Sequence, residues 1–363
     1  MSKYKICVYT ICKNEEQFVD RWMDSMQEAD LVVVCDTGST DNTVEKLKNR
    51  GAEVYSICVS PWRFDVARNI SLDFIPGDFD ICVCTDLDEV LEPGWRENME
   101  RIWTPDTTRL KYMYTWNFKA DGSRGATYWY EKIHGRHGYR WVNPIHENVK
   151  YYGEKEVYAY DSTIQLNHFP DNTKSRGQYL SLLEISKKEN PLDSSTVFWL
   201  GREYMYYGLY DKSIETLNEH LSLPTATWDQ ERCASMRYIA RCKKAKGEIQ
   251  EAKKWLYKAI AECLDIREPY MEMARLGYEL KEWTLVLHMI DETLKIQSKQ
   301  VSYLVEDSSW DFSPYDLGAI ACYQTGLLDK ALDLAKTAYE FNPNDLRLKN
   351  NFDIIKEKAA LEK

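Results

Sequence analysis

The sequence lacks several patterns that identify common classes of protein. No GxxxxGK[ST], GxGxxG or GxSxG motif occurs, which argues against P-loop phosphate transfer, dinucleotide binding and a hydrolase nucleophile elbow. The absence of any CxxC pair makes a cysteine-ligated zinc site improbable. No apolar run reaches the roughly 18 residues needed to span a bilayer, and residues 1–10 have no apolar core of an export signal. We therefore expect a cytoplasmic protein with no membrane span.

A surplus of positive charge is also missing. The 363 residues carry 47 Lys and Arg against 58 Asp and Glu, a net charge of -11. Non-specific binding to nucleic acid or to an anionic membrane is therefore not expected. The chain has ten cysteines, but a reducing compartment argues against disulfides. Cys7, Cys35, Cys82 and Cys84 lie in apolar runs and are expected to be buried thiols.

Up to about residue 170, strand-like and helix-like segments alternate. This alternation predicts βαβ units and an α/β fold with a mostly parallel central sheet. The less regular part from 109 to 168 is rich in β-branched and aromatic residues, and 109–135 is expected to form a hairpin. The expected strands before it are 4–12, 30–38, 53–59 and 79–89, and the expected helices are 14–26, 39–51 and 63–75.

Polar residues follow each of the four expected strands. In parallel sheets, ligands bind at the carboxyl ends of the strands, so side chains placed there lie along one edge. Four polar strand ends on the same edge predict a binding site. The residues are Asn14 and Glu16, Asp36 and Ser39, Arg63 and Asp65, and Asp86 and Asp88.

The stretch CTDLDEVLE places Asp86, Asp88 and Glu89 within four positions of one strand end. Any one of these acidic residues could belong to a solvated turn. Neighbouring carboxylates repel each other, however, and become favourable together when a divalent cation neutralises them. Mg²⁺ and Mn²⁺ prefer oxygen ligands, and Mg²⁺ commonly binds one or two carboxylates together with substrate phosphates. The motif therefore indicates a nucleoside diphosphate substrate.

The chain changes character near Asn190, after which helical segments repeat. Small and aromatic residues recur at the positions where a tetratricopeptide helix pair needs close packing. We therefore expect two domains, an α/β domain over 1–170 and an all-α tetratricopeptide-like helical repeat domain over 171–363. The recurring residues are Gly201, Tyr204, Gly208 and Ser213, then Gly247 and Ala252, then Gly326, Ala331, Ala338 and Pro343.

Four motifs in order, TICKNEE, DTGSTDNTVE, ARN and CTDLDE, resemble a family 2 glycosyltransferase. The resemblance covers about residues 4–170 and implies a GT-A nucleotide-sugar-binding fold. The continuation NPIHENV and LNHFPDN, followed by helical repeats, resembles the branch of this family that contains the sublancin S-glycosyltransferase. The sublancin enzyme attaches a sugar to a peptide cysteine. The motifs do not identify the acceptor.

The resemblance implies roles for individual residues. Asp88 would be the main metal ligand, and Asp86 would touch the ribose or the metal, which would be Mn²⁺ or Mg²⁺. His146 and His168 compete for a third metal position, although either one alone is nearly as well explained as a hydrogen-bonded structural histidine. The residues implied to bind the donor are Thr10, Asn14, Glu16, Asp36, Ser39, Asp41, Arg68, Asn69 and Asp86.

An inverting mechanism needs a base on the side of the sugar opposite the leaving group. Glu147, in PIHEN, is the preferred base. Glu89 is the alternative, and it could instead orient a metal ligand or face the donor sugar. An acceptor thiol, with an ordinary pKa of about 8.5, would need a weaker base.

Two classes of function remain open at this point. The first is a metal-dependent inverting glycosyltransferase that moves a hexose from a UDP-sugar to a Cys, Ser or Thr side chain or to a cell-envelope saccharide. In that case the aromatic stretch 112–141 would stack on sugar or peptide, and the repeats would hold a polypeptide acceptor or a second copy of the chain. The second is a non-catalytic sugar-nucleotide-binding scaffold that acts through its repeats.

Overall fold

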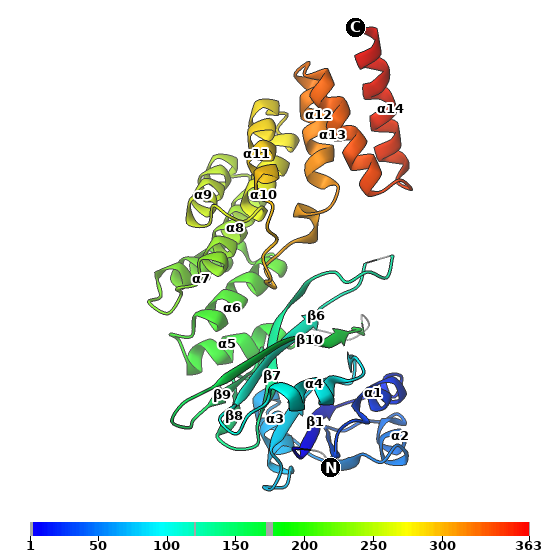
Figure 1. The fold of residues 1–363 in the computed structure, drawn as a ribbon. Coiled ribbons are helices and arrows are strands. Elements are labelled where there is room, and N and C mark those ends of the chain that lie inside the picture. The colour runs from blue at the N-terminus through cyan, green and yellow to red at the C-terminus, as the bar shows by residue number, and fades with distance from the viewer. Residues whose placement is uncertain (1–2, 120, 172–176, 363) are drawn as a thin grey trace. The chain divides into compact units, whose positions relative to one another are not determined.

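The computed structural model describes residues 3–119, 121–171 and 177–362, and the chain forms two compact units, Met1–Glu189 and Asn190–Lys363 (Figure 1). This division coincides with the change in character near Asn190. It differs from the expected boundary at residue 170, because helix α5 (Tyr179–Glu189) belongs to the first unit. Among the described residues, no helix is both long and apolar enough to cross a membrane.

The first unit is built around an eight-stranded sheet with the order β3-β2-β1-β4-β7-β6-β10-β5. Strands β3, β2, β1 and β4 are parallel neighbours, and β10 is parallel to β6. Only β7 and β5 run against their neighbours, so the mostly parallel sheet is confirmed. The strands are β1 Ile6–Cys12, β2 Leu31–Asp36, β3 Glu53–Ser56, β4 Ile81–Cys84, β5 Glu89–Leu91, β6 Arg109–Thr115, β7 Thr127–Gly135 and β10 Tyr158–His168.

Strand β1 is buried along its whole length because both faces of the sheet are covered. Ile6 and Val8 belong to one hydrophobic core, and Cys7 and Tyr9 belong to another on the opposite face. Successive side chains of a strand point to opposite faces, so a strand covered twice reads as a continuous apolar run. The helices of this unit besides α5 are α1 Val19–Met26, α2 Thr43–Asn49, α3 Phe64–Asp73 and α4 Trp95–Ile102.

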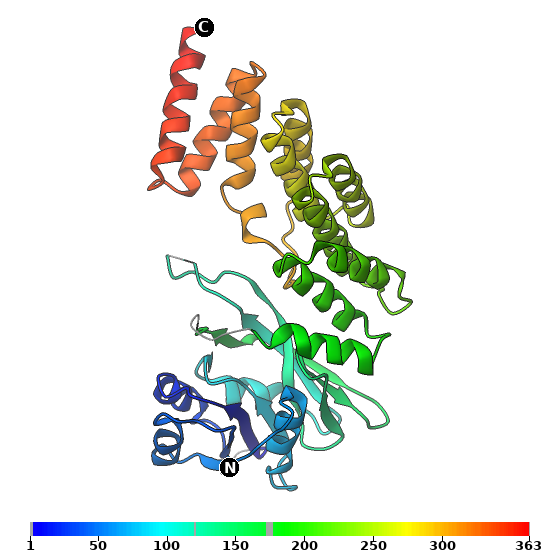
Figure 2. The same ribbon diagram turned by 180° about the vertical axis from the view of Figure 1, so that it is seen from behind.

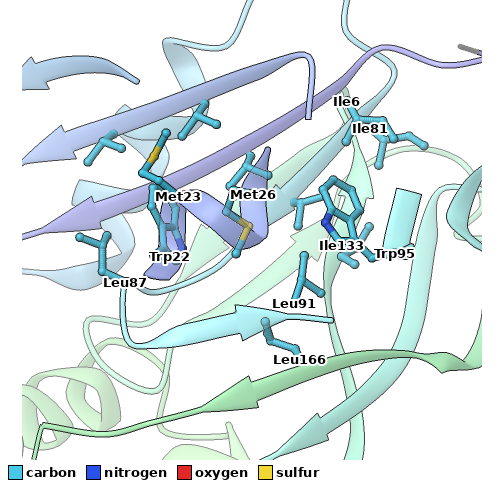
Figure 3. Packing of buried hydrophobic residues seen from close by; sticks show 14 of the residues in the cluster. Ile6, Trp22, Met23, Met26, Ile81, Leu87, Leu91, Trp95, Ile133 and Leu166 are labelled. Carbon is cyan, nitrogen blue, oxygen red and sulfur yellow. The ribbon is translucent and has the colours of Figure 1, made fainter. Parts of the chain in front are cut away.

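The larger core packs α1 and α4 against the sheet (Figure 3). Trp22 and Met26 of α1 lie four residues apart on one helical face and are fully buried. Trp95 of α4 joins them beside Ile81 and Ile133 from the sheet. The spacing of Trp22 and Met26 therefore places both side chains on the buried face of α1.

The second half of the first unit forms the expected hairpin and a small extra sheet. Strands β6 and β7 pair antiparallel across the turn between them. Strands β8 (Tyr139–Val142) and β9 (Asn148–Tyr151) make a separate two-stranded sheet. The antiparallel pairing of β5 with β10 places His168 directly opposite Glu89. This pairing brings the end of β10 to the acidic motif.

All ten cysteines are free thiols. Cys7, Cys35, Cys82 and Cys84 are fully buried, as their apolar surroundings in the sequence predict. Burial raises the pKa of Cys82 to about 12, since a thiolate is poorly solvated in the core. These four thiols therefore act as small apolar side chains.

The second unit is a stack of helix pairs (Figure 2). Gly201 lets α6 and α7 approach closely, because an added Cβ would lie 2.6 Å from Leu217. The turns at Gly208 and Gly326 have φ of 71° and 78°, which glycine adopts without strain. This is a tetratricopeptide-like arrangement. The helices are α6 Ser194–Tyr206, α7 Tyr210–Ser222, α8 Asp229–Ala245, α9 Ile249–Glu262, α10 Glu268–Glu279, α11 Trp283–Lys295, α12 Ser313–Gln324, α13 Leu328–Phe341 and α14 Leu346–Leu361.

Candidate active site

The acidic motif forms a tight turn between β4 and β5, and Glu89 holds that turn. The Asp86 backbone N–H donates to Glu89 Oε2 at 2.8 Å, and the Glu89 N–H donates to the Asp86 carbonyl at 3.0 Å. The Tyr114 hydroxyl donates to Glu89 Oε1 at 2.9 Å. Glu89 is 2% exposed, and this burial raises the pKa of its carboxyl group. Both of its oxygens are therefore used within the protein.

Asp86 lies between two cations from different elements. Arg68 of α3 donates to Asp86 Oδ1 at 2.7 Å, and Lys132 Nζ of β7 lies 3.5 Å from Asp86 Oδ2. Burial alone would raise the pKa of Asp86, but the two cations outweigh burial and hold it below its ordinary value. Asp86 is therefore ionised, and 35% of its side chain remains exposed.

Arg68 connects this acidic turn to the predicted base. Its Nε donates to Glu147 Oε1 at 2.5 Å, and its guanidinium lies 5.2 Å from the centre of the Trp141 ring. The Arg68 side chain is 4% exposed and that of Glu147 is 11% exposed. Within the described part of the chain, Glu147 Oε2 has no hydrogen-bond partner. The predicted base is thus brought to the site, with one oxygen fixed and the other available.

Asp88 faces His168 across the β5–β10 pairing. His168 Nε2 lies 3.4 Å from Asp88 Oδ2, and its Nδ1 lies 3.0 Å from the Trp116 carbonyl oxygen. A carbonyl only accepts, so Nδ1 carries a proton and Nε2 is the atom that faces the carboxylate. Burial lowers the pKa of His168, but the neighbouring Asp88 outweighs burial and raises it. A proton or a metal ion is the natural partner between these two atoms.

The Asp88–His168 pair fits a divalent cation that is also held by substrate. Metal-binding histidines usually donate their second ring N–H to a carbonyl, as His168 does to Trp116. No three Asp, Glu, His or Cys side chains among the described residues lie close enough to enclose a metal ion. A cation bound at this pair would have Asp88 and His168 as protein ligands, and substrate would have to supply the others.

His146 is not part of that pair in the described structure. It has a φ of 48° and its ring packs edge-on against Tyr179 of α5, with the ring centres 6.1 Å apart. Of the two histidines that compete for the metal position, the structure brings only His168 to Asp88.

Asn69 makes a structural contact rather than pointing into the site. Its side-chain Nδ2 donates to the Trp141 carbonyl at 2.8 Å, and its Oδ1 accepts from the Trp141 N–H at 2.9 Å. Both ends of the amide are therefore used to clamp β8 onto α3. The clamp fixes the Trp141 ring that lies against Arg68.

The loop after β1 is tied to the loop after β2 by the residues expected to bind the donor. The Asn14 N–H donates to Ser39 Oγ at 2.8 Å, and Asn14 Oδ1 accepts from the Thr40 N–H at 2.7 Å. Glu16 Oε2 accepts from the Asn42 N–H at 2.8 Å. These side chains lie together at the strand ends, and they order the two loops.

Two carboxylates complete this loop network. Asp36 Oδ1 accepts from the Ser39 N–H at 3.1 Å, and Asp41 Oδ1 accepts from the Thr43 N–H at 3.0 Å at the start of α2. Thr10 lies apart from both loops, because it is fully buried inside β1 and its hydroxyl donates to the Ile11 carbonyl. The structure therefore groups the loop residues but keeps Thr10 in the core.

Two site residues were not found from the sequence. Lys132 lies inside the hairpin, and its only signal is a charge within the aromatic run TYWYEKIHG. Trp116 packs on His168 with ring centres 4.6 Å apart and is 44% exposed. Their positions depend on how β6, β7 and β10 pair, which local patterns do not determine.

Aromatic rings line the same side of the hairpin as the acidic turn. Tyr114 packs against Tyr130 with ring centres 4.5 Å apart and also against Tyr128 at 5.5 Å. Trp129 points to the other face of the sheet, where it meets Tyr160 at 6.0 Å. The expected aromatic stretch is thus divided between two faces, and only one of them borders the acidic turn.

Comparison with known families identifies the class of the first unit. Residues 7–144 match the sequence model of the family described as Glycosyl transferase family 2. The chain therefore contains a family 2 glycosyltransferase domain, and the matched residues include the loops after β1 and β2, Arg68, and the acidic turn. The match supports glycosyltransferase activity in general. It does not concern the sublancin branch, which stays a prediction.

Comparison with solved structures concerns the helical unit. MamA matches with a TM-score of 0.37 and 21% identity over 45% of this chain and 86% of that chain. YrrB, described as a TPR protein with an unusual peptide-binding site, matches with a TM-score of 0.39 and 13% identity over 49% and 84%. A thermophilic TPR protein of Thermus thermophilus matches with a TM-score of 0.33 and 22% identity over 49% and 91%. Scores this low carry no argument, and the repeat architecture stands on the helices described above.

Proposed function

We propose that this protein is an inverting, metal-dependent glycosyltransferase that moves a hexose from a UDP-sugar to an acceptor side chain or saccharide. The observation that carries the proposal is the group of charged residues at the carboxyl end of β4. There Asp86 and Asp88 meet Arg68, Lys132 and His168, which come from three other elements. Both signs of charge meet at a strand end, which is where a nucleotide diphosphate and a cation would bind.

Asp88 and His168 would hold Mn²⁺ or Mg²⁺ in this scheme. The bound cation would supply Lewis-acid stabilisation of the negative charge that develops on the leaving diphosphate. The carboxylate offers an oxygen, and the imidazole offers a nitrogen whose ring is oriented by the Trp116 carbonyl. Both side chains are mostly buried, which fixes them in place before substrate arrives.

Arg68 and Lys132 are the cations proposed to act on the donor. Both are mostly buried, with side chains 4% and 11% exposed, so their charges are weakly screened by water. They keep Asp86 ionised, and an ionised Asp86 can accept hydrogen bonds from ribose hydroxyl groups. The loop residues around Asn14 and Asp36 would line the nucleoside-binding part of the site.

Glu147 is the proposed general base. Arg68 orients one of its oxygens, and the other oxygen is available to take a proton from the acceptor. Glu89 is less suited to act as the general base, because both of its oxygens already accept hydrogen bonds and its side chain is 2% exposed. We assign Glu89 to holding the Asp86–Asp88 turn.

The acceptor is proposed to be a peptide or protein side chain, either Cys or Ser/Thr, with a cell-envelope saccharide as the alternative. The exposed Trp116 ring beside His168 offers a surface on which a sugar or peptide could stack. The helical repeats are proposed to hold a polypeptide acceptor or a second copy of the chain.

UDP release tests the proposal directly. The full chain is incubated with a panel of UDP-sugars and Mn²⁺, and UDP is measured over time with and without excess EDTA. Sustained, EDTA-sensitive release supports a metal-dependent transferase. Binding of a UDP-sugar without turnover would instead identify the non-catalytic scaffold. Binding of none of them would contradict both functions.

A further inference from the structure

The connection between α11 and α12 is longer than the repeat architecture requires. It runs from 296 to 312 and contains one short 3-10 helix, η1 (Asp307–Ser309). The corresponding connections between α7 and α8 and between α9 and α10 run only over 223–228 and 263–267. Because α11 and α12 pack directly against each other, the extra length is not needed to join them. We call residues 296–312 the strap.

The strap runs back along the preceding repeats and contacts α10, α8 and α6 (Figures 1 and 2). Its first contact is Tyr303. The Tyr303 ring stacks on Trp199 with ring centres 5.3 Å apart and meets Trp228 at 5.4 Å. Its hydroxyl donates to Glu231 Oε2 at 3.0 Å. An aromatic side chain with a polar tip therefore packs against the first two repeats.

Glu306 makes the second contact, with three arginines. It pairs with Arg237, with Arg241 at 2.7 Å, and with Arg275 at 3.8 Å. Burial would raise the pKa of Glu306, but Arg237 and Arg241 outweigh burial and lower it to about 2. Glu306 is thus held as a carboxylate.

Trp310 makes the third contact. Its indole N–H donates to Glu268 Oε1 at 3.2 Å, and the Arg267 guanidinium lies 4.0 Å from the centre of its ring. Arg275 also donates to the Ser308 carbonyl at 3.0 Å. The strap is therefore held by side chains spaced along an extended segment, in the pattern Tyr-x-x-Glu-x-x-x-Trp.

The arginines need a carboxylate that the helices do not supply. With the strap in place Arg237 is 2% exposed, and among the described residues of the helices Arg237 and Arg241 have only Glu272 as an ion-pair partner. A buried guanidinium without enough opposite charge is costly, so this face favours an acidic occupant. The strap provides that charge through Glu306.

We propose that the face formed by α6, α8 and α10 is a binding site for extended acidic peptides, and that the strap is an internal ligand which occupies it. The partner is a peptide with the chemistry of the strap, an aromatic residue followed three positions later by a carboxylate. The proposal concerns the second unit alone and does not rest on glycosyl transfer.

The contacts of the strap are those of a bound peptide rather than of a packed helix. Its backbone forms turns of its own, such as Val305 N–H to the Ser302 carbonyl and Ser309 N–H to the Glu306 carbonyl. Side chains of α10 and of the residue before it bind the rest of its backbone: Glu268 accepts from the Glu306 N–H, and Arg267 and Arg275 donate to strap carbonyls. Side-chain anchors hold it to the helices, and a peptide of the same sequence could replace each of them. A tethered ligand acts at an effective concentration of about millimolar. The intact chain therefore masks its own site from peptides at micromolar concentration.

The test uses a fluorescein-labelled peptide of the strap sequence, KQVSYLVEDSSWD, and the full chain. A variant carrying Tyr303→Ala and Glu306→Gln loses two anchors and leaves the site open. We expect fluorescence anisotropy to show peptide binding to this variant at least about tenfold tighter than to the unmodified chain, because the internal competitor is weakened. A peptide with Gln in place of its single Glu should bind at least about tenfold more weakly.

A further substitution in the open variant tests the site itself. Arg241→Gln removes one of the cations that meet the peptide carboxylate and should weaken binding by about tenfold. Lys244→Gln, three residues on in α8, is the matched control, because Lys244 pairs with Glu279 instead and is 42% exposed. It should leave binding unchanged.

Circular dichroism and thermal unfolding establish that each variant is folded. If the double variant is unfolded, Glu306→Gln alone is measured with the same peptide. Failure of the peptide to bind any folded open variant would overturn the proposal, and so would equal binding of a scrambled peptide. Unfolding of both the double and the single variant would also overturn it, since the strap would then be an essential part of the repeat core.

Discussion

Each of the two units of the chain buries a cluster of basic and acidic side chains. Carboxylates outnumber the cations in the first cluster, and arginines outnumber the carboxylates of the helices in the second. In the first unit, the cations Arg68 and Lys132 face a larger number of carboxylates. In the second unit, Arg237, Arg241 and Arg275 outnumber the carboxylates that the helices provide. The carboxylates that act on Arg68 or Lys132 are those of Asp86, Glu89 and Glu147.

The two clusters differ in whether the chain itself supplies the opposite charge that balances the excess. The second cluster is completed within the chain, because the strap delivers Glu306 to the arginines. The first cluster keeps exposed carboxylate surface on Asp86 and a facing pair of ligand atoms on Asp88 and His168. The strap stabilises the second cluster by occupying its face as an internal ligand, whereas the first cluster keeps its surplus charge open to an external ligand. Substitutions in the two clusters should therefore have different consequences.

Asp88→Asn should have the largest effect. It replaces a charged ligand by a neutral amide, and loss of several kcal/mol of charge stabilisation predicts a fall in UDP release of more than about 1000-fold. The thermal unfolding temperature should change little, since the residue lies in a turn at a strand end. The matched control is Asp78→Asn, a surface carboxylate paired with Lys5 and 65% exposed. Activity of Asp88→Asn near that of the control would contradict the metal assignment.

Glu147→Gln should reduce sugar transfer by about 10²- to 10⁴-fold, the usual loss when a general base is removed. Gln can still accept from Arg68, so the site should keep its shape. Affinity for the UDP-sugar, measured by calorimetry, should barely change. Glu154→Gln, on an exposed loop, serves as the control. Transfer at the normal rate to a hydroxyl acceptor would rule out Glu147 as the base.

Glu306→Gln should lower the free energy of unfolding of the second unit by about 3 kcal/mol. This is the lower end of the range for breaking a buried ion pair, because 29% of the Glu306 side chain is exposed. Hydrogen exchange should accelerate in α8 and α10, while UDP release should stay unchanged. Glu279→Gln, from an exposed pair with Lys244, should leave exchange as it was. A loss of UDP release without faster exchange would contradict the expectation that Glu306 stabilises the second unit and has no part in UDP release.

His168→Ala should raise the Mn²⁺ concentration needed for half-maximal UDP release by about 10- to 100-fold, with partial rescue at high Mn²⁺. His146→Ala is its natural counterpart, because His146 packs against Tyr179 instead of facing Asp88. Its Mn²⁺ requirement should stay near that of the unmodified chain. The reverse result would assign the metal position to His146.

Glu306 and Glu89 should contribute to stability with opposite pH dependence, as the smallest effect. Glu306 has its pKa lowered from 4.5 to about 2, so the stability it contributes is complete above pH 4.5 and is lost as pH falls toward 2. The buried Glu89 has a raised pKa, so its contribution is complete below pH 4.5 and is lost as pH rises through the raised value. Hydrogen exchange, corrected for intrinsic rates, should show protection of α8 falling in acid. Protection of α8 that does not fall as the pH approaches 2 would contradict the role given to Glu306.

Much of the fold was predicted from the sequence, for local reasons. The strands before residue 90 are apolar runs that end at polar residues, and the helix at Trp22 and Met26 follows a spacing of four. The turns at Gly208 and Gly326 need a positive φ. These features depend on a few consecutive residues, so a linear sequence carries them. The position of Asp86 and Asp88 at a strand end was predicted in the same way, because these residues directly follow an apolar run.

Only the tertiary structure decided which residues meet these carboxylates. Lys132 reaches Asp86 because β7 pairs with β4, and His168 reaches Asp88 because β10 pairs with β5. Strand pairing joins residues far apart in the chain, and a shift of one position would turn each side chain to the other face. Asn69 likewise binds the backbone of Trp141 after the fold has brought β8 onto α3. The sequence alone determined the acidic turn and the repeats, whereas long-range pairing determined the partners that complete each cluster.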